Sequence, residues 1–261
     1  MEKIAFIGMG NMAQALAAGF ISSGKIKGED ITAFAPNQEK LHRNAEKIGF
    51  IPASDSRSAV KDAGIVIMAC KPYQIIQVLE GLGDALNGKA LISVAAGWDY
   101  KRYSEVLDPS VRFQFVMPNT PAMVGEGVLL FEETNSLEQE ERREIMELFG
   151  TVGDVHILPS RLMGIGGAVS GCSPAFIDML LEAFADAGVK YGLPRETAYR
   201  LIAKTALGSA ALQMATGEHP GALKDKVCSP GGTTIAGVAA LEEAGFRNAC
   251  IKAIDAVMQR G

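Results

Sequence analysis

The first 158 residues alternate between short apolar runs and stretches with helical spacing, and this alternation restricts the fold more than any other feature. Each run is almost continuously apolar, as in strands that are buried on both faces of a sheet. The runs are KIAFIG, ITAFA, IVIMAC, ALISVAA, VRFQFVM and GVLLF. Helices are expected between them, for example at 11–23, 38–48, 74–82 and 137–150. This order predicts an α/β domain with a mostly parallel, doubly wound sheet and helices on both sides.

Residues 159–261 contain no further strand-like run and are expected to form a separate all-α domain. Ser173 is predicted to cap a helix that begins with Pro174, and Gly188 or Gly192 is predicted to end it. Further helices are expected in RETAYRLIAKTALGSAALQMATG, TTIAGVAALEEAGF and RNACIKAIDAVMQ. We therefore expect two domains, with the boundary after residue 158.

The expected helical domain is rich in Ala, Leu, Met and Gly, so it has few large side chains with which to build its own core. Small residues let helices approach one another closely. We therefore expect this domain to bury apolar surface against a second copy of itself, which would make the protein a homodimer.

Composition excludes several partners. The net charge is −5 and the chain has no basic block, which argues against nucleic acid. No uninterrupted apolar run reaches the roughly 18 residues of a membrane span, so we expect no membrane partner and a cytoplasmic protein. The four cysteines lack C-x-x-C and zinc-ligand spacing, so we expect free thiols and no metal site.

The stretch IAFIGMGNMAQAL reads as a strand, a glycine-rich turn and a helix. The first glycine permits the tight turn, the second leaves room for a pyrophosphate, and the small third residue lets the helix pack on the strand. The helix N-terminus then presents backbone N–H groups to the phosphates. We expect a dinucleotide here, held by Gly8, Met9, Gly10, Asn11, Met12 and Ala13.

The end of the second expected strand bears on which dinucleotide binds. NAD-selective sites usually carry Asp or Glu at this position, but the chain reads Ala35-Pro36-Asn37. Asn37 can donate a hydrogen bond to a 2′-phosphate, and Lys40 or Arg43 can supply positive charge. This favours NADPH, and NADH stays as the alternative because no arginine stands at the strand end itself.

Small and turn-forming residues follow three later strands, in MACKPYQ, SVAAGW and VMPNTPAMVGEG. Turn chemistry would explain any one of these segments alone. In an open α/β sheet, however, ligands bind beyond the carboxyl ends of the strands, so three such segments together favour a site. The residues expected on the nicotinamide side are Lys71, Pro72, Ala95, Gly97, Asn119 and Pro121.

The late stretch KDKVCSPGGTTIAG, residues 224–237, interrupts a helical region with Pro230, Gly231 and Gly232. Inside a helix a glycine costs about 1 kcal/mol and a proline about 3 kcal/mol, so a loop is expected, with the next helix beginning near Thr233. Inward-turned N–H groups and the positive end of that helix would bind a small anion. A plain connecting loop is the alternative.

With these motifs the chain resembles the pyrroline-5-carboxylate reductases. The matching stretches are IGMGNMAQAL, CKPYQ, SVAAG, MPNTPAMVGEG, SGCSPAFI and HPGALKDKVCSPGGTTIAGVAALEEAGFR, which span nearly the whole chain in order. The resemblance implies a Rossmann domain followed by a helical dimerisation domain. It also implies dimers that interlock through these helices and often assemble further, commonly as a decamer of five dimers.

The resemblance further implies hydride transfer from NADPH to the imine of 1-pyrroline-5-carboxylate, which gives L-proline in the last step of proline biosynthesis. The substrate carboxylate would be held by the late loop, and the Thr234 hydroxyl would lie near the ring nitrogen as the catalytic group. The implied substrate-binding residues are Ser229, Gly231, Gly232, Thr233 and Thr234.

The chain departs from the family pattern at two places. The motif that often reads S-G-S-G-P-A-Y is SGCSPAF here, so Phe176 lacks the tyrosine hydroxyl. Some relatives carry a glutamate one residue before Glu218, where this chain has Gly217, so Glu218 receives no role.

Two other functions compete with this interpretation. A β-hydroxyacid reductase of the same plan would usually carry a lysine in a glycine-rich motif of the helical half, which is missing here. A non-catalytic nucleotide sensor would need the first glycine-rich loop but not the second.

Overall fold

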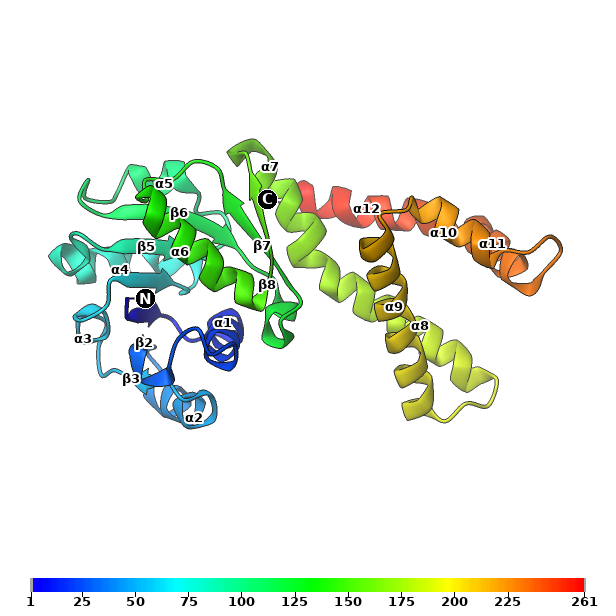
Figure 1. The fold of residues 1–261 in the computed structure, drawn as a ribbon, viewed down its shortest axis with the longest axis horizontal. Helices are drawn as coiled ribbons and strands as arrows, with labels where there is room; N and C mark the ends of the chain where they lie inside the picture. The colour runs from blue at the N-terminus through cyan, green and yellow to red at the C-terminus, as the bar shows by residue number, and fades with distance from the viewer. Residues whose placement is uncertain (1, 261) are drawn as a thin grey trace. The chain divides into compact units, whose positions relative to one another are not determined.

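The structure, a computed structural model, describes residues 2–260 (Figure 1). The chain folds into two compact units, one that extends to Cys172 and one that covers Ser173–Arg260. The first unit contains the sheet and is called the sheet unit below. The second contains only helices among its described residues and is called the helical unit.

The sheet unit holds eight strands in the order β3-β2-β1-β4-β5-β6-β7-β8 within the described residues. All neighbours pair in parallel except β6 and β7, which are antiparallel. The order reverses between β1 and β4, which confirms the predicted doubly wound sheet. The strands are β1 (Ile4–Ile7), β2 (Ile31–Phe34), β3 (Ile51–Pro52), β4 (Ile65–Met68), β5 (Ala90–Ser93), β6 (Arg112–Met117), β7 (Gly127–Glu132) and β8 (Gly153–Leu158).

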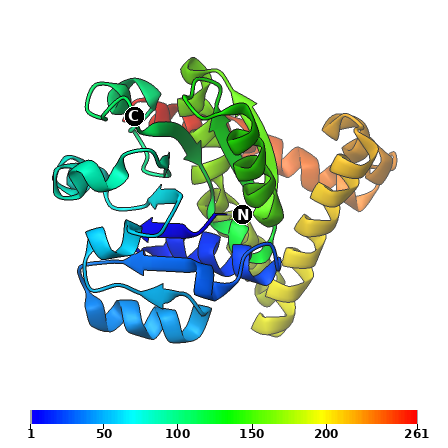
Figure 2. The same ribbon diagram turned by 60° about the vertical axis from the view of Figure 1, so that its left-hand side comes forward.

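Helices cover both faces of this sheet (Figure 2). Successive residues of β1 alternate between two core clusters, one built with α1, α2 and α6 and the other with α3, α4 and α5. The four helices expected from the sequence are confirmed to within two residues. The helices are α1 (Asn11–Ser22), α2 (Gln38–Ile48), α3 (Ser56–Val60), α4 (Ile75–Leu82), α5 (Tyr100–Ser104), α6 (Gln139–Phe149) and α7 (Ser160–Gly167).

Three phenylalanines pack α1, β7 and α6 against one another. The rings of Phe20 and Phe149 lie 5.2 Å apart and those of Phe131 and Phe149 lie 5.5 Å apart, both edge to face. All three side chains are fully buried. Because α1 begins directly after the first glycine-rich turn, this packing fixes the direction in which the N-terminus of α1 points.

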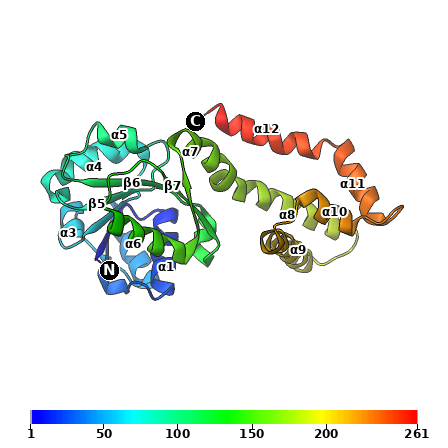
Figure 3. The same ribbon diagram turned by 45° about the horizontal axis from the view of Figure 1, so that its top comes forward.

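The helical unit consists of five helices in its described residues, α8 (Ser173–Lys190), α9 (Arg195–Thr216), α10 (Pro220–Val227), α11 (Thr233–Glu243) and α12 (Phe246–Met258) (Figure 3). Only Ala185 and Ala198 are buried among its apolar side chains. The unit therefore has almost no core within one copy of the chain, as its small-residue composition predicts.

The prediction that Ser173 caps a new helix is wrong. The chain is helical without a break from Ser160 to Lys190, because a π-helical turn (Ala168–Cys172) joins α7 to α8. Proline has no N–H, so Pro174 removes one hydrogen bond from the helix. The helix accommodates this loss with a wider turn and continues.

This continuous helix also has the length and composition of a membrane span, and only 11% of its apolar stretch is buried. The segment is not an uninterrupted apolar run, because Arg161 and Asp178 divide it. Its apolar surface is unfavourable in water, so it is expected to lie against lipid or another protein surface.

Replacing Phe149 by alanine is expected to lower the free energy of unfolding by about 3–5 kcal/mol, because the ring fills the space between α1 and β7. Tyr73→Ala is the control, since Tyr73 is 83% exposed and should change the value by less than about 0.5 kcal/mol. Urea unfolding at one fixed protein concentration measures both. Equal values for the two variants would contradict this role of Phe149.

Candidate active site

The residues expected to bind the cofactor follow neighbouring strands, and the structure brings these strand ends to one edge of the sheet. Three backbone hydrogen bonds continue the parallel ladders past the strand ends: Gly8 N to Phe34 O at 2.8 Å, Ala69 N to Ile7 O at 2.8 Å, and Val94 N to Met68 O at 3.0 Å. The turns after β1, β2, β4 and β5 are thus in register at the point where the strand order reverses, which is where such sheets bind ligands.

The first glycine-rich turn has the geometry that a pyrophosphate needs. Gly8 adopts φ +99°, and a Cβ at this position would lie 2.6 Å from the Ala69 carbonyl oxygen, so only glycine fits. A Cβ on Gly10, in contrast, would meet nothing within 4 Å. The space beside Gly10 is open on the protein side, as expected where a ligand approaches the backbone.

The N-terminus of α1 is left free for an anion. Its N-cap is Gly10, which has no side chain to accept from the first N–H groups, and its first turn holds no acidic residue. Met9 and Ala13 are buried in the core, and Met12 packs against it. These three residues can therefore contribute only backbone groups, and Asn11 is exposed.

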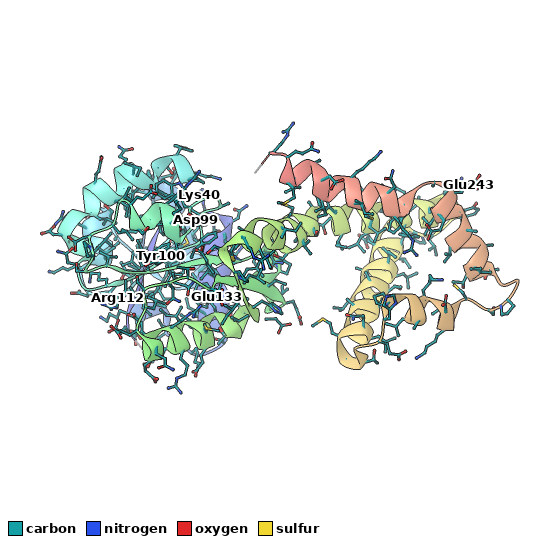
Figure 4. The ribbon with its side chains drawn as sticks, turned by 90° about the horizontal axis from the view of Figure 1, so that it is seen from above. Lys40, Asp99, Tyr100, Arg112, Glu133 and Glu243 are labelled. Carbon is teal, nitrogen blue, oxygen red and sulfur yellow. The ribbon has the colours of Figure 1, made fainter. Side chains whose placement is uncertain are left out.

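Asn37 ends the turn after β2 and caps α2. Its Oδ1 accepts from the Lys40 N–H at 2.9 Å, so the Nδ2 donor is still available. Lys40, labelled in Figure 4, and Arg43 are exposed and form no ion pair with other described residues. The Gln38 side chain, which sequence reasoning missed, donates to the Ala35 carbonyl at 3.0 Å and fixes this turn.

Lys71 and Pro72 follow β4 and open the short helix η2 (Pro72–Gln74). The Gln74 side chain accepts from the Lys71 N–H at 3.2 Å, which fixes the turn. Lys71 and Pro72 are both exposed. The Lys71 ammonium is therefore available to an anionic ligand beside the point where the strand order reverses.

The turns after β5 and β6 present mainly backbone. Ala95 is buried and donates its N–H to Ser93 Oγ at 3.3 Å. Gly97 has φ +76°, and its carbonyl accepts from the Arg102 guanidinium. Pro121 is half-buried in the helical turn η4 (Thr120–Val124).

Behind these turns lie two ionisable side chains that burial keeps protonated. Tyr103 donates to Ser93 Oγ at 3.1 Å, and burial raises the pKa of its hydroxyl. Burial likewise raises the pKa of the Cys70 thiol to about 11. Neither group titrates near neutral pH, so neither is suited to act as a base.

Asn119 differs from the other expected site residues because its polar side chain is buried and bonded to protein. Nδ2 donates to the Ser170 carbonyl at 3.0 Å, and Oδ1 accepts from the Val128 N–H at 2.9 Å. The side chain is 5% exposed. One donor and one acceptor of the carboxamide are thus used within the protein.

The late loop of the helical unit leads into a second helix that begins after a glycine. We call such an uncapped, glycine-started helix N-terminus a helix entrance, and the first is at Gly10. Gly232 N donates to the Ser229 carbonyl at 3.0 Å across Pro230 and Gly231, and Gly231 has φ +67°, the pattern of a type II turn. A Cβ on Gly232 would lie 2.4 Å from Ser229 Oγ and 3.2 Å from the Ser229 carbonyl oxygen, so a larger residue would require the Ser229 side chain to rotate. Helix α11 begins at Thr233, as predicted.

The two helix entrances share one design. Gly232 is the N-cap of α11 with φ −80° and ψ 171°, close to φ −76° and ψ −175° at Gly10. Neither helix has a side-chain cap or an acidic residue in its first turn. The N–H groups of Thr233 and Thr234 and their exposed hydroxyls are available to a small anion.

No cluster of three or more His, Cys, Asp or Glu side chains that could hold a metal occurs among the described residues 2–260. The four cysteines are free thiols. The Glu218 carboxylate pairs with the Lys226 ammonium at 2.5 Å and 2.7 Å.

A doubly wound sheet with a glycine-rich turn where its strand order reverses, followed by a helical unit, is the architecture of a dinucleotide-dependent oxidoreductase. Residues 3–97 match the family described as NADP oxidoreductase coenzyme F420-dependent, and residues 160–261 match pyrroline-5-carboxylate reductase dimerisation. The first match lies within the sheet unit, and the second begins in α7 and includes the helical unit.

Comparison with whole proteins is more specific. The chain is 39% identical over 260 residues to pyrroline-5-carboxylate reductase of Treponema pallidum (strain Nichols), covering 98% of each sequence. It is 37% identical to the enzyme of that name from Escherichia coli (strain K12), covering 99% of this chain and 97% of the relative. The chain belongs to the pyrroline-5-carboxylate reductase family.

The fold agrees with that assignment. A crystal structure of Plasmodium falciparum pyrroline carboxylate reductase with NADP bound superposes with a TM-score of 0.90 at 29% identity. The superposition covers 99% of this chain and 96% of the other. The resemblance stated from sequence motifs is thus confirmed along the full chain.

Gly10→Val is expected to abolish NADPH binding, because the side chain would occupy the open space beside the N-terminus of α1 without touching protein. Gly81→Val is the control, since a Cβ there also meets nothing within 4 Å but Gly81 lies in α4. Fluorescence titration with NADPH measures both. Retained affinity in the Gly10 variant would refute the placement of the pyrophosphate.

Proposed function

We propose that this chain is an NADPH-dependent pyrroline-5-carboxylate reductase that reduces the imine of 1-pyrroline-5-carboxylate to L-proline, the last step of proline biosynthesis. The observation that carries the proposal is the pair of uncapped, glycine-started helices in a chain of this family. One entrance suits a pyrophosphate and the other suits the carboxylate of the substrate. We assign cofactor binding to residues 1–158, and dimerisation and substrate binding to residues 159–261.

The sheet unit holds the dinucleotide. NADPH supplies the hydride when it is bound. The N–H groups at the start of α1 bind its pyrophosphate, and Gly8 and Gly10 allow the close approach. Asn37 donates its free Nδ2 to the 2′-phosphate, and Lys40 or Arg43 provides the charge that favours NADPH over NADH.

The turns after β4, β5 and β6 line the nicotinamide side. Lys71 and Pro72 form one wall, Ala95 and Gly97 the next, and Pro121 the third. Most of these residues present backbone atoms, so they shape the site and exclude water more than they take part in proton transfer.

The loop Ser229–Thr234 binds the substrate carboxylate. Ser229 and Thr233 offer hydroxyl donors, and Gly231 and Gly232 let the backbone N–H groups reach the anion. Thr234, the second residue of α11, donates its hydroxyl to the ring nitrogen of the imine. A preorganised donor at this atom stabilises the charge that changes there during the reaction, so no strong base is needed.

The helical unit buries its apolar surface against a second copy of the chain. A groove of about 580 Å³ runs along α8, α11 and α12 and is lined almost entirely by apolar side chains. The lining includes Phe176, Leu180, Phe184, Leu241, Phe246 and Ala253. A homodimer through the C-terminal helices would cover it, and further assembly as a ring of five dimers would follow the family pattern.

The same dimer would cover the long apolar helix from Ser160 to Lys190. A partner subunit therefore replaces lipid as its neighbour, since residues 160–261 match a dimerisation family. We accordingly propose a cytoplasmic enzyme with no membrane partner.

Steady-state oxidation of NADPH and NADH in the presence of 1-pyrroline-5-carboxylate tests this function. We expect proline as the product and a higher kcat/KM with NADPH than with NADH. Activity with 3-hydroxy acids instead would identify a β-hydroxyacid reductase. Absence of NADPH oxidation even in a single turnover would identify a nucleotide sensor.

Thr234→Val keeps the shape of the side chain and removes the hydroxyl. We expect kcat to fall roughly 100-fold, while KM for NADPH changes little. Thr205→Val is the matched control, because the Thr205 hydroxyl donates to the Leu201 carbonyl on α9 at 2.8 Å. An unchanged kcat for the Thr234 variant would remove this hydroxyl from the mechanism.

Phe184→Asp places a charge in the apolar groove and is expected to convert dimers or larger assemblies to monomers in sedimentation velocity at micromolar concentration. Glu182→Gln, on the same helix but outside the groove lining, should leave the assembly unchanged. A wild-type chain that sediments as a monomer would refute the dimer itself.

A further inference from the structure

The buried carboxamide of Asn119 joins three segments that are separate in the sequence. It stands at the end of β6, at the start of the loop 118–126. Its Nδ2 donates to the Ser170 carbonyl in the π-helical turn, and its Oδ1 accepts from the Val128 N–H at the start of β7. One amide side chain thus serves as both donor and acceptor for two backbone groups outside its own loop.

The Ser170 carbonyl needs a donor because of the sequence that follows it. In an α-helix this oxygen would accept from the N–H of the residue four positions later, which is Pro174. Proline has no N–H, so the carbonyl loses its partner inside the helix. The π-helical turn and the 3.0 Å bond from Asn119 Nδ2 are the structural answer to that loss.

The Val128 N–H needs an acceptor because β6 and β7 pair only briefly. The antiparallel register joins Val116 to Phe131 and Met117 to Leu130, and it ends before the loop. Asn119 Oδ1 accepts from Val128 at 2.9 Å and extends the connection by a side chain. The loop is therefore tied at its base to β7.

The loop itself contributes a residue to the proposed nicotinamide side. Pro121 lies in it, and the tip exposes Met123 by 58% and Val124 by 76%. Two hydrogen bonds shape the tip, from Gly125 N to the Ala122 carbonyl and from Glu126 N to the Pro121 carbonyl. Neither of these bonds reaches β7. Ala122 is fully buried beside Gly127, and the Asn119 side chain adds the hydrogen bond that ties the base of the loop to Val128.

We propose that Asn119 is a positioning residue for the reductase. Its side chain holds the loop 118–126 at the strand-end edge by bridging Val128 and Ser170, and it does not bind the cofactor or the substrate itself. This inference rests on the proposed function. The sequence led us to expect that Asn119 contacts the cofactor. For its side chain, we now propose the positioning role instead.

The Asn119→Asp variant tests this role, because a simple loss of packing would not produce its expected pH dependence. A protonated carboxyl can donate to Ser170 and accept from Val128 as the amide does, whereas a carboxylate has no donor and repels the Ser170 oxygen. Burial raises the pKa of such a carboxyl, because it disfavours the charged form. The tie is thus present at pH values below that pKa and lost above it.

Few other groups would disturb this titration. Glu126 is the one carboxylate of the loop and is exposed, Glu132 lies at the far end of β7, and Cys172 is the one ionisable side chain of the π-helical turn.

The experiment measures kcat and the NADPH Kd of wild type and Asn119→Asp from pH 5.5 to 9 in the full-length protein. We expect the kcat ratio of variant to wild type to be near one at low pH and to fall up to about tenfold per pH unit above the pKa of the introduced carboxyl. The NADPH Kd should change less than about twofold. Asn135→Asp is the matched control.

Asn135 makes the same two kinds of bond, from Nδ2 to the Glu133 carbonyl at 3.0 Å and to Oδ1 from the Leu137 N–H at 3.1 Å, but it lies outside the loop. Its variant should show a flat ratio. A flat ratio for Asn119→Asp as well, or an NADPH Kd that rises tenfold while kcat is unchanged, would overturn the proposal.

Hydrogen exchange of Asn119→Ala gives a readout that does not depend on activity. We expect faster exchange in peptides covering 118–128 and unchanged exchange in peptides covering 4–22. Unchanged exchange in 118–128 would overturn the positioning role. A wild-type protein without pyrroline-5-carboxylate-dependent NADPH oxidation would instead contradict the proposed function, and the exchange result would still decide the role of Asn119.

Discussion

Unpaired N–H groups at the start of two helices are the feature on which the rest of this structure depends. Helix α1 begins after Gly10 and helix α11 after Gly232, in nearly the same extended conformation. A serine or aspartate at either position would satisfy one of these N–H groups from within the chain and stabilise the helix by roughly a few tenths of a kcal/mol relative to glycine. Glycine leaves the N–H groups open to external anions at the two positions where we propose binding sites.

The two units secure these helix entrances differently. In the sheet unit, the buried rings of Phe20, Phe131 and Phe149 hold α1. The turn at Gly8 lies against the backbone of Ala69, directly after β4. The helical unit has only Ala185 and Ala198 in its interior, so one copy supplies little packing energy. We infer that a partner subunit stabilises α11, which would make substrate binding depend on assembly.

The sequence predicted six of the eight described strands, four helices of the sheet unit, three of the helical unit and both glycine turns. Buried parallel strands and helix breakers leave strong local patterns. The sequence did not reveal β3, which has two residues, or β8, whose exposure alternates along an edge. Ser173 and Pro174 looked like a helix start because proline is favoured there, and only the unbroken helix around them corrects this. The ties from Asn119 to Ser170 and from Tyr103 to Ser93 leave no local pattern, since they join residues distant in sequence or depend on packing. Whether the remaining expected residues touch the ligands stays a prediction.

The ratio of kcat/KM for 1-pyrroline-5-carboxylate to that for 1-pyrroline, which lacks the carboxylate, tests most directly whether the two helix entrances have separate roles. Hydrogen bonds to a charged group contribute about 1.5–3 kcal/mol each, so the account predicts a preference of at least roughly tenfold for the carboxylate, with an unchanged NADPH Kd. Equal kcat/KM values for the two imines would contradict the claim that α11 binds the substrate carboxylate.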